Sequence, residues 1–194
     1  MIDIHSVKHY LSVYIIKIKT EIYFSLYLAQ FLARNFDLYG KLTPSINDKN
    51  ILQAYLDGIV SCSYLDVISH VLTCVYNGLD FNNQDDPTFR FTRMIPSALQ
   101  SLNRILEKSS TPFFYDQNEP TIADYFAFEA YMIARDYHQK VLPSDETCQT
   151  LKKLEQTMKE RPAIANYFAK GLLSKRFTAS PREIDYIEKL FSTK

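Results

Sequence analysis

The chain has 194 residues, 46% of them hydrophobic, and its 22 Lys and Arg balance 22 Asp and Glu. Such a length holds one full domain with a hydrophobic core and part of a second, and balanced charge gives no reason to expect a nucleic-acid partner. The apolar, charge-free stretch Ile22–Ala33 is shorter than the roughly 20 residues that cross a bilayer. The cysteines lack the spacing of a disulfide framework, and the pair His5 and His9, four residues apart, has no acidic or cysteine partner of matching spacing for a metal site. We therefore expect a cytoplasmic protein with no metal, no membrane and no nucleic acid.

The first 24 residues differ in pattern from the rest of the chain. Val13–Ile18 is rich in β-branched and aromatic residues, Lys19–Glu21 is polar, and Ile22–Phe24 is apolar again. This pattern predicts two short strands joined by a tight turn. One amphipathic helix over Val7–Lys19 is the alternative interpretation.

From Ser25 onward, apolar residues recur at helical spacing. Ser25 is placed to cap a helix that runs to Asn35, and Leu38–Pro44 is typical of a linker. Pro96 is expected to kink the helix in which it lies. Further helices are predicted at Asp48–Asn77, Thr88–Lys108, Thr121–Ile133, Thr147–Lys159, Pro162–Gly171 and after Ser180. No strand pattern follows residue 24, so the chain is predicted to be mainly α, with a helical bundle at residues 46–194.

The segment Thr121–Asp124 (T-I-A-D) is the sharpest local signal. The Thr121 side chain can accept the backbone N–H of Asp124, and the Asp124 carboxylate can accept the N–H of Thr121. The negative charge would also face the positive end of the helix dipole. The following residues are apolar on most sides, so this helix is predicted to be buried and its cap to be important for stability.

This capping segment, with Pro120 before it and Tyr125 after it, resembles the one that opens the central helix of the C-terminal domain in glutathione S-transferases of the cytosolic alpha, mu, pi and sigma type. Three more segments resemble the family in the family's order. They are Ser25–Gly40, Ala54–Ile59 and Glu160–Ile164. The resemblance implies a C-terminal helical domain at residues 46–194, preceded at residues 1–40 by part of a thioredoxin-like domain, namely its last β-hairpin and helix.

The resemblance also implies a set of glutathione-binding positions. Ser25 matches the serine that accepts the γ-glutamyl carboxylate at a helix start, a place suited to anions. Phe24 stands where the family has Gln. Val13, with Tyr14 beside it, stands where a cis-proline exposes a backbone pair to glutathione. Asp57 matches an acid that reaches across the dimer to the glutathione amine in several classes; a solvated helix residue is the alternative.

The family's catalytic Tyr or Ser has no match in this chain, and no catalytic residue is assigned. A β-α-β unit needs about 30 residues, whereas Met1–Ser12 offers only twelve before the predicted strands. The resemblance implies conjugation of reduced glutathione, as co-substrate, to hydrophobic electrophiles by a homodimeric detoxification enzyme. We expect that activity to be reduced here. A non-catalytic interaction module with this fold is the alternative, and an unrelated helical bundle is a more distant one.

The last predicted helix begins with Ser180-Pro181-Arg182-Glu183, which combines an N-cap, a first-turn proline and a glutamate at the third helical position. Its apolar face is formed by Ile184, Ile187, Leu190 and Phe191. In some classes of the family such a helix closes the electrophile pocket. A docked terminal helix without a functional role is the alternative that we favour.

Overall fold

The computed structural model describes residues 29–35, 37–44, 46–79, 89–170 and 178–192. The chain divides into two compact units, residues 1–37 and 38–194. In the first unit, residues 29–35 are helical, and the amide of Asn35 donates to the Phe31 carbonyl at 2.7 Å. The strands expected at Val13–Phe24 and the cap expected at Ser25 lie outside the described residues, and the division at residues 40 and 46 stays a prediction.

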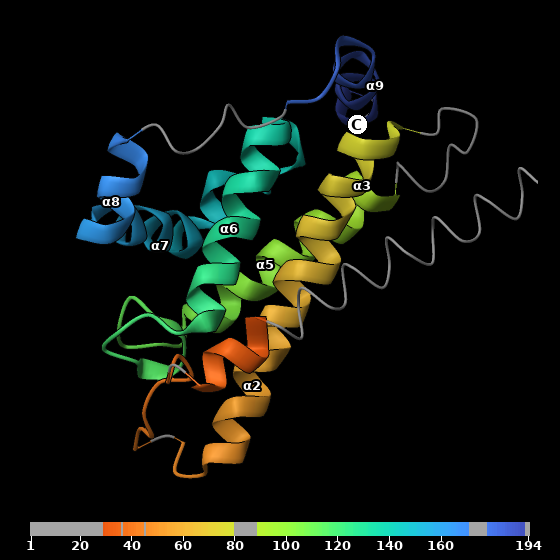
Figure 1. The fold of residues 1–194 in the computed structure, drawn as a ribbon. Coiled ribbons are helices and arrows are strands. Elements are labelled where there is room, and N and C mark those ends of the chain that lie inside the picture. The colour runs from red at the N-terminus through yellow and green to blue at the C-terminus, as the bar shows by residue number, and fades with distance from the viewer. Residues whose placement is uncertain (1–28, 36, 45, 80–88, 171–177, 193–194) are drawn as a thin grey trace, which may run out of the picture. The chain divides into compact units, whose positions relative to one another are not determined.

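The second unit is a bundle of helices (Figure 1). Its described residues contain no strand, only an isolated bridge between Thr43 and Ile46. The mainly α fold predicted from the sequence is therefore confirmed for this part of the chain. Its longer elements are α2 (Lys49–Ser61), η1 (Cys62–Ile68), α3 (Ser69–Asn77), η2 (Arg90–Met94), α5 (Ile95–Leu106), α6 (Ile122–Tyr137), α7 (Gln149–Glu160), α8 (Pro162–Ala169) and α9 (Pro181–Ser192). Short 3-10 turns occur at η3 (Phe114–Asp116), η4 (Gln139–Val141) and η5 (Asp145–Thr147).

Helix α6 forms the centre of the bundle, with its main contacts to α2, η1 and α7. A row of alanines at helical spacing is fully buried along it, namely Ala123, Ala127, Ala130 and Ala134. Small side chains let neighbouring helix backbones approach closely, and larger residues of those helices, such as Leu56 on α2 and Leu151 on α7, are also fully buried. The helix continues to Tyr137, beyond the predicted end at Ile133, because Ala134 and Tyr137 are still buried.

The helical stretch predicted at Asp48–Asn77 is continuous from Lys49 and consists of α2, η1 and α3. Asp48 caps its start by accepting the N–H groups of Asn50 and Ile51, and Gly78, with φ of 68°, follows its end. By length and composition, Lys49–Tyr76 could cross a membrane. The same test is passed by the core helix of a soluble protein, and here α6 packs against this stretch.

The helix predicted at Thr88–Lys108 contains a π-helical segment directly before Pro96. In η2 the hydrogen bonds span five residues, so that the N–H of Ile95 donates to the carbonyl of Arg90. Pro96 has no N–H to donate and sits in the first turn of α5, where that donor is not needed. At the position where the sequence predicts a kink, the structure has a wider, π-helical turn directly before Pro96.

Helix α9 is joined to the C-terminal end of α6. Glu183 accepts the N–H of Ser180 at 2.7 Å, as its predicted cap requires. The N–H of Ala179 donates to the carbonyl of Tyr137 at 3.0 Å, and Glu188 pairs with Lys140. Ile187 is fully buried, whereas Ile184 is 37% exposed. The apolar face of α9 is thus only partly covered.

The predicted cap at the start of α6 is present and is fully buried. Asp124 is 0% exposed, and its Oδ2 accepts both the N–H and the hydroxyl of Thr121 at 2.7 Å each. Thr121 and Asp124 form a capping box, and the N–H of Asp124 also lies 3.1 Å from the Thr121 carbonyl. The Phe114 N–H donates to the other carboxylate oxygen at 3.0 Å. Asp124 therefore fastens the Phe113–Gln117 loop as well as the helix.

The linker Leu38–Lys41 is fastened to the same place. The N–H of Ile122 donates to the Leu38 carbonyl at 2.9 Å. The buried amide of Gln117 bonds twice to the backbone of Lys41, accepting its N–H and donating to its carbonyl at 2.7 Å each. Gly40, which directly precedes Lys41, has a φ of 73°. It packs so closely against Gln117 that an added Cβ would lie 2.3 Å from Gln117 Oε1. We call this set of hydrogen bonds the linker contact.

Asp124→Asn should destabilise the protein, and the loss should be larger at low pH. Burial raises the pKa of Asp124 to about 6 despite the hydrogen bonds that lower it. Because the folded-state pKa lies above the unfolded one, this group costs the wild type stability as pH rises from about 4 to 6. Asn does not titrate. The difference in free energy of unfolding between wild type and Asp124→Asn should therefore be smaller by about 2 kcal/mol at pH 7 than at pH 4. Chemical denaturation at both pH values measures it; a deficit that grows with pH would contradict the assignment.

Gly40→Ala should destabilise by about 2–4 kcal/mol, because it combines a left-handed backbone with a displaced Gln117. Gly58→Ala is the matched control. Gly58 lies inside α2 with no atom within 4 Å of an added Cβ, so this change should stabilise by roughly 0.5–1 kcal/mol. Thermal unfolding of both variants tests the linker contact, and equal effects of the two would refute it.

Candidate functional site

Of the predicted glutathione-binding residues, only Asp57 lies in the described part of the chain. Ser25, Phe24, Val13 and Tyr14 lie outside it, and their roles stay predictions. Asp57 sits in the third turn of α2 and is half-buried. The structural pair Thr121 and Asp124 lies in the bundle core, as described above.

The Asp57 carboxylate is held by a residue that the sequence did not suggest. The hydroxyl of Tyr39 donates to Asp57 Oδ1 at 2.5 Å. Tyr39 belongs to the linker and is buried to 6% exposure, so its ring is fixed and its hydroxyl has one direction in which to point. The linker contact on Leu38, Lys41 and Gly40 holds the backbone on both sides of Tyr39. Asp57 is therefore an oriented carboxylate rather than a side chain moving freely in solvent.

An aromatic pair lies on the face of the long helix that carries Asp57. Tyr64 follows Asp57 by seven residues, which places it two turns further along the same face. Its ring meets that of Phe126 on α6 edge to face, with centroids 6.0 Å apart. Both residues are only half-buried, and burial raises the pKa of the Tyr64 hydroxyl, which keeps it protonated at neutral pH. This face thus offers an oriented carboxylate and an apolar aromatic surface.

Two cysteine thiols, those of Cys62 and Cys148, are not activated nucleophiles. Burial, followed by the charge and hydrogen bonding of Asp66, raises the pKa of Cys62 to about 12. Burial and Glu107 raise the pKa of Cys148 to about 11. The thiolate is the reactive form, so both thiols are inert at neutral pH. No cluster of three or more metal-binding side chains occurs among the described residues.

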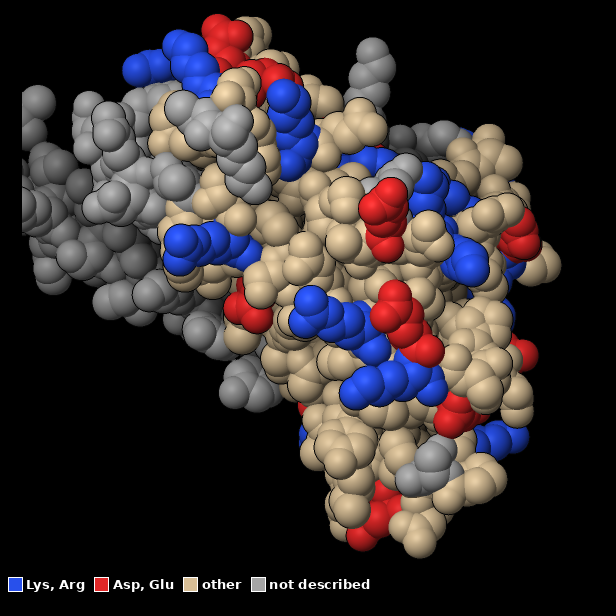
Figure 2. Space-filling view, turned by 180° about the vertical axis from the view of Figure 1, so that it is seen from behind, with Lys and Arg blue, Asp and Glu red and all other residues tan. Residues whose placement is uncertain are grey.

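The surface charge is mixed. On the face drawn in Figure 2, Lys and Arg side chains alternate with Asp and Glu, and neither sign gathers into a patch. Several surface charges form ion pairs: Arg161 pairs with Glu119 at 2.8 Å, and Glu155 pairs with both Arg135 and Lys159. This face offers no basic stripe of the kind that binds nucleic acids.

Comparison with known proteins agrees with this architecture. Residues 65–171 match the family model described as "Glutathione S-transferase, C-terminal domain". Among solved structures, the chain is similar to a Pi-class glutathione S-transferase from Onchocerca volvulus, with a TM-score of 0.55 and 19% identity. The similarity covers 74% of this chain and 62% of that one, so the chain spans less than two thirds of the solved protein. The search of curated proteins gives no match.

The family match includes half of η1 and all of α5, α6, α7 and α8, so it contains the buried cap and Phe126 of the aromatic pair. The solved structure supports the same fold independently. On these grounds the chain belongs to the glutathione S-transferase family.

Proposed function

We propose that this protein binds reduced glutathione and joins its thiol to hydrophobic electrophiles as a cytoplasmic, homodimeric detoxification enzyme. The observation that carries the proposal is the face of α2 and η1 where Tyr39 orients the Asp57 carboxylate and where Tyr64 and Phe126 meet. An oriented carboxylate can accept the ammonium group of a peptide-like molecule. A half-buried aromatic pair can pack against an apolar electrophile.

The chemistry is a displacement or addition by sulfur. The glutathione thiol loses its proton to solvent, and the thiolate forms a C–S bond with the electrophilic carbon. In a displacement, the leaving group departs with the bonding electron pair. Ser25 is proposed to donate hydrogen bonds to the γ-glutamyl carboxylate, with Val13 and Tyr14 contributing backbone groups and Phe24 lining the site. No residue in this sequence is assigned the role of the hydroxyl that lowers the thiol pKa.

The alternative function, a non-catalytic interaction module, has its support in exposed apolar side chains. Ile51 is 46% exposed and Tyr55 is 49% exposed, both on α2. Retention of the purified chain on immobilised glutathione, followed by elution with free glutathione, separates the two functions. Flow-through together with no thioether formed from chlorodinitrobenzene would favour the interaction module.

Ser25→Ala and Asp57→Asn should each weaken glutathione binding about tenfold, since each removes a charge-assisted hydrogen bond. Tyr39→Phe should give a smaller loss, because the carboxylate stays but is no longer oriented. Calorimetric titration with glutathione measures all three. Asp185→Asn, an exposed acid on α9, is the control. If Asp57→Asn and Asp185→Asn behave alike, Asp57 is only a solvated helix residue.

Tyr64→Ala should raise the KM for chlorodinitrobenzene by about three- to tenfold, the value of one aromatic contact. It should leave glutathione binding unchanged, because Tyr64 lies two turns from Asp57. Tyr76→Ala is the control, since Tyr76 is 78% exposed on α3. Steady-state kinetics with each substrate varied in turn tests this; a change in the KM for glutathione alone would place Tyr64 in a different role.

A further inference from the structure

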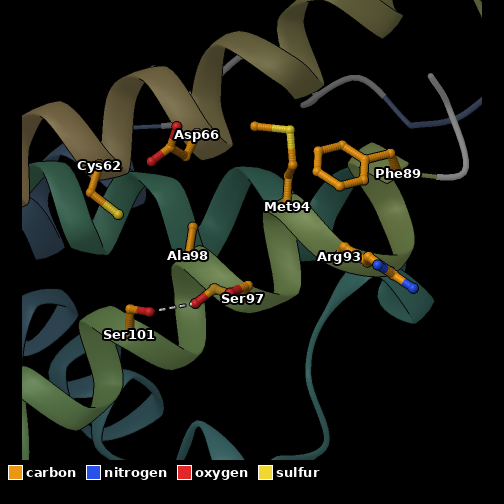
Figure 3. A pocket seen from close by; sticks show the side chains of 8 residues that line it. All are labelled: Cys62, Asp66, Phe89, Arg93, Met94, Ser97, Ala98 and Ser101. Carbon is orange, nitrogen blue, oxygen red and sulfur yellow. Dashed lines mark hydrogen bonds between the residues drawn. The ribbon is translucent and has the colours of Figure 1, made fainter.

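The two π-helical segments of the described structure border one cavity. It is open to solvent and has a volume of about 330 Å³. Segment η1 supplies Cys62 and Asp66, and Met94 comes from η2 (Figure 3). Segment η1 also packs along α5, which forms the opposite wall. Because π-helical turns are rare and are frequent at functional sites, two of them around one cavity call for a functional explanation.

We propose that this cavity binds a small organic ammonium compound with an apolar, ring-sized body. The inference does not depend on glutathione binding, because none of the proposed glutathione-binding residues lines the cavity. Three features of the cavity support it: a carboxylate that forms no ion pair among the described residues, a serine hydroxyl oxygen on α5 and an apolar end.

Asp66 supplies the negative charge. Among the residues that the structure describes, it forms no ion pair, and it contacts the neutral thiol of Cys62. In Figure 3 the Asp66 carboxylate and the Cys62 sulfur lie on the same side of the cavity, above α5. Arg93, also at the cavity, directs its guanidinium away from it (Figure 3). A carboxylate at a cavity that is not ion-paired with any described residue is suited to an ammonium group.

Two serines on α5, Ser97 and Ser101, line the same cavity as the carboxylate. The Ser101 hydroxyl donates to the carbonyl of Ser97 at 2.8 Å, which uses its proton and leaves its oxygen lone pairs as acceptors (Figure 3). An ammonium group has three N–H donors and no acceptor. A carboxylate on one wall and a hydroxyl oxygen on the other therefore match its hydrogen-bonding needs better than those of an anion.

The other end of the cavity is apolar. Phe89 is 51% exposed and stands next to Met94 (Figure 3). A large aromatic ring left half in water at a cavity mouth is available to cover the body of a ligand. A thioether beside it adapts to ligands of different shape. The ammonium group and the apolar body are thereby assigned to opposite ends of the site.

The test is calorimetric titration of the full chain with phenylethylamine as probe. We expect binding at least about tenfold tighter than that of neutral phenylethanol or anionic phenylpropionate, because only the amine can pair with the carboxylate. Asp66→Asn should weaken amine binding about tenfold or more, whereas Asp185→Asn should not change it. Asn can still accept from Cys62, so the fold should be kept, and thermal unfolding of the variant verifies this.

Equal affinity for the three probes, or unchanged amine binding in folded Asp66→Asn, would overturn the proposal. A third result would also overturn it: the wild type is a dimer, Asp66→Asn dissociates that dimer, and phenylethylamine neither binds the protein nor weakens dimerisation. In that case a basic side chain of a second copy would be the partner of the carboxylate. Phe89→Ala provides a second test. It should weaken the binding of phenylethylamine and of phenylethanol by the same factor, so that the preference for the amine is preserved.

Discussion

One buried carboxylate holds together the start of the central helix and the loop that precedes it. Asp124 has no solvent exposure, and three donors converge on it from Thr121 and Phe114. A charge in such a place is tolerated only when it is well hydrogen-bonded. Because the same group closes the helix start and the loop before it, the direction of α6 and the course of the Phe113–Gln117 loop are fixed together.

The rest of the candidate site is arranged around that point. The loop fixed by Asp124 presents Gln117, which bonds to the linker backbone at Lys41. The linker in turn places Tyr39, whose hydroxyl reaches Asp57 on α2. A chain of contacts thus runs from the buried cap through the loop and the linker to the carboxylate proposed to bind glutathione. The contacts between these segments are hydrogen bonds in buried or half-buried settings, where the low local dielectric strengthens them.

The sequence predicts what depends on local pattern. Helical spacing predicts the long helices, and T-I-A-D by itself predicts the capping box. The π-helical segments are not predictable in this way, since a run such as Cys62–Ile68 has the apolar spacing of an ordinary helix. The Phe114 donor to Asp124 and the Tyr39–Asp57 bond join residues 10 and 18 positions apart. No periodicity marks such contacts, because they depend on how the loops settle on the finished bundle. The only signal in the sequence for this bond is that Tyr39, in the linker, carries a hydroxyl that could donate to an acid on the next helix.

The linker contact also makes the linker a rigid part of the bundle. A linker is usually the place where motion between parts of a protein is absorbed. Here Leu38 and Lys41 are tied to the start of α6, and Gly40 packs too tightly against Gln117 to admit a side chain. Residues 38–41 are therefore part of the rigid bundle, and a force applied at Leu38 would pass directly to the start of α6.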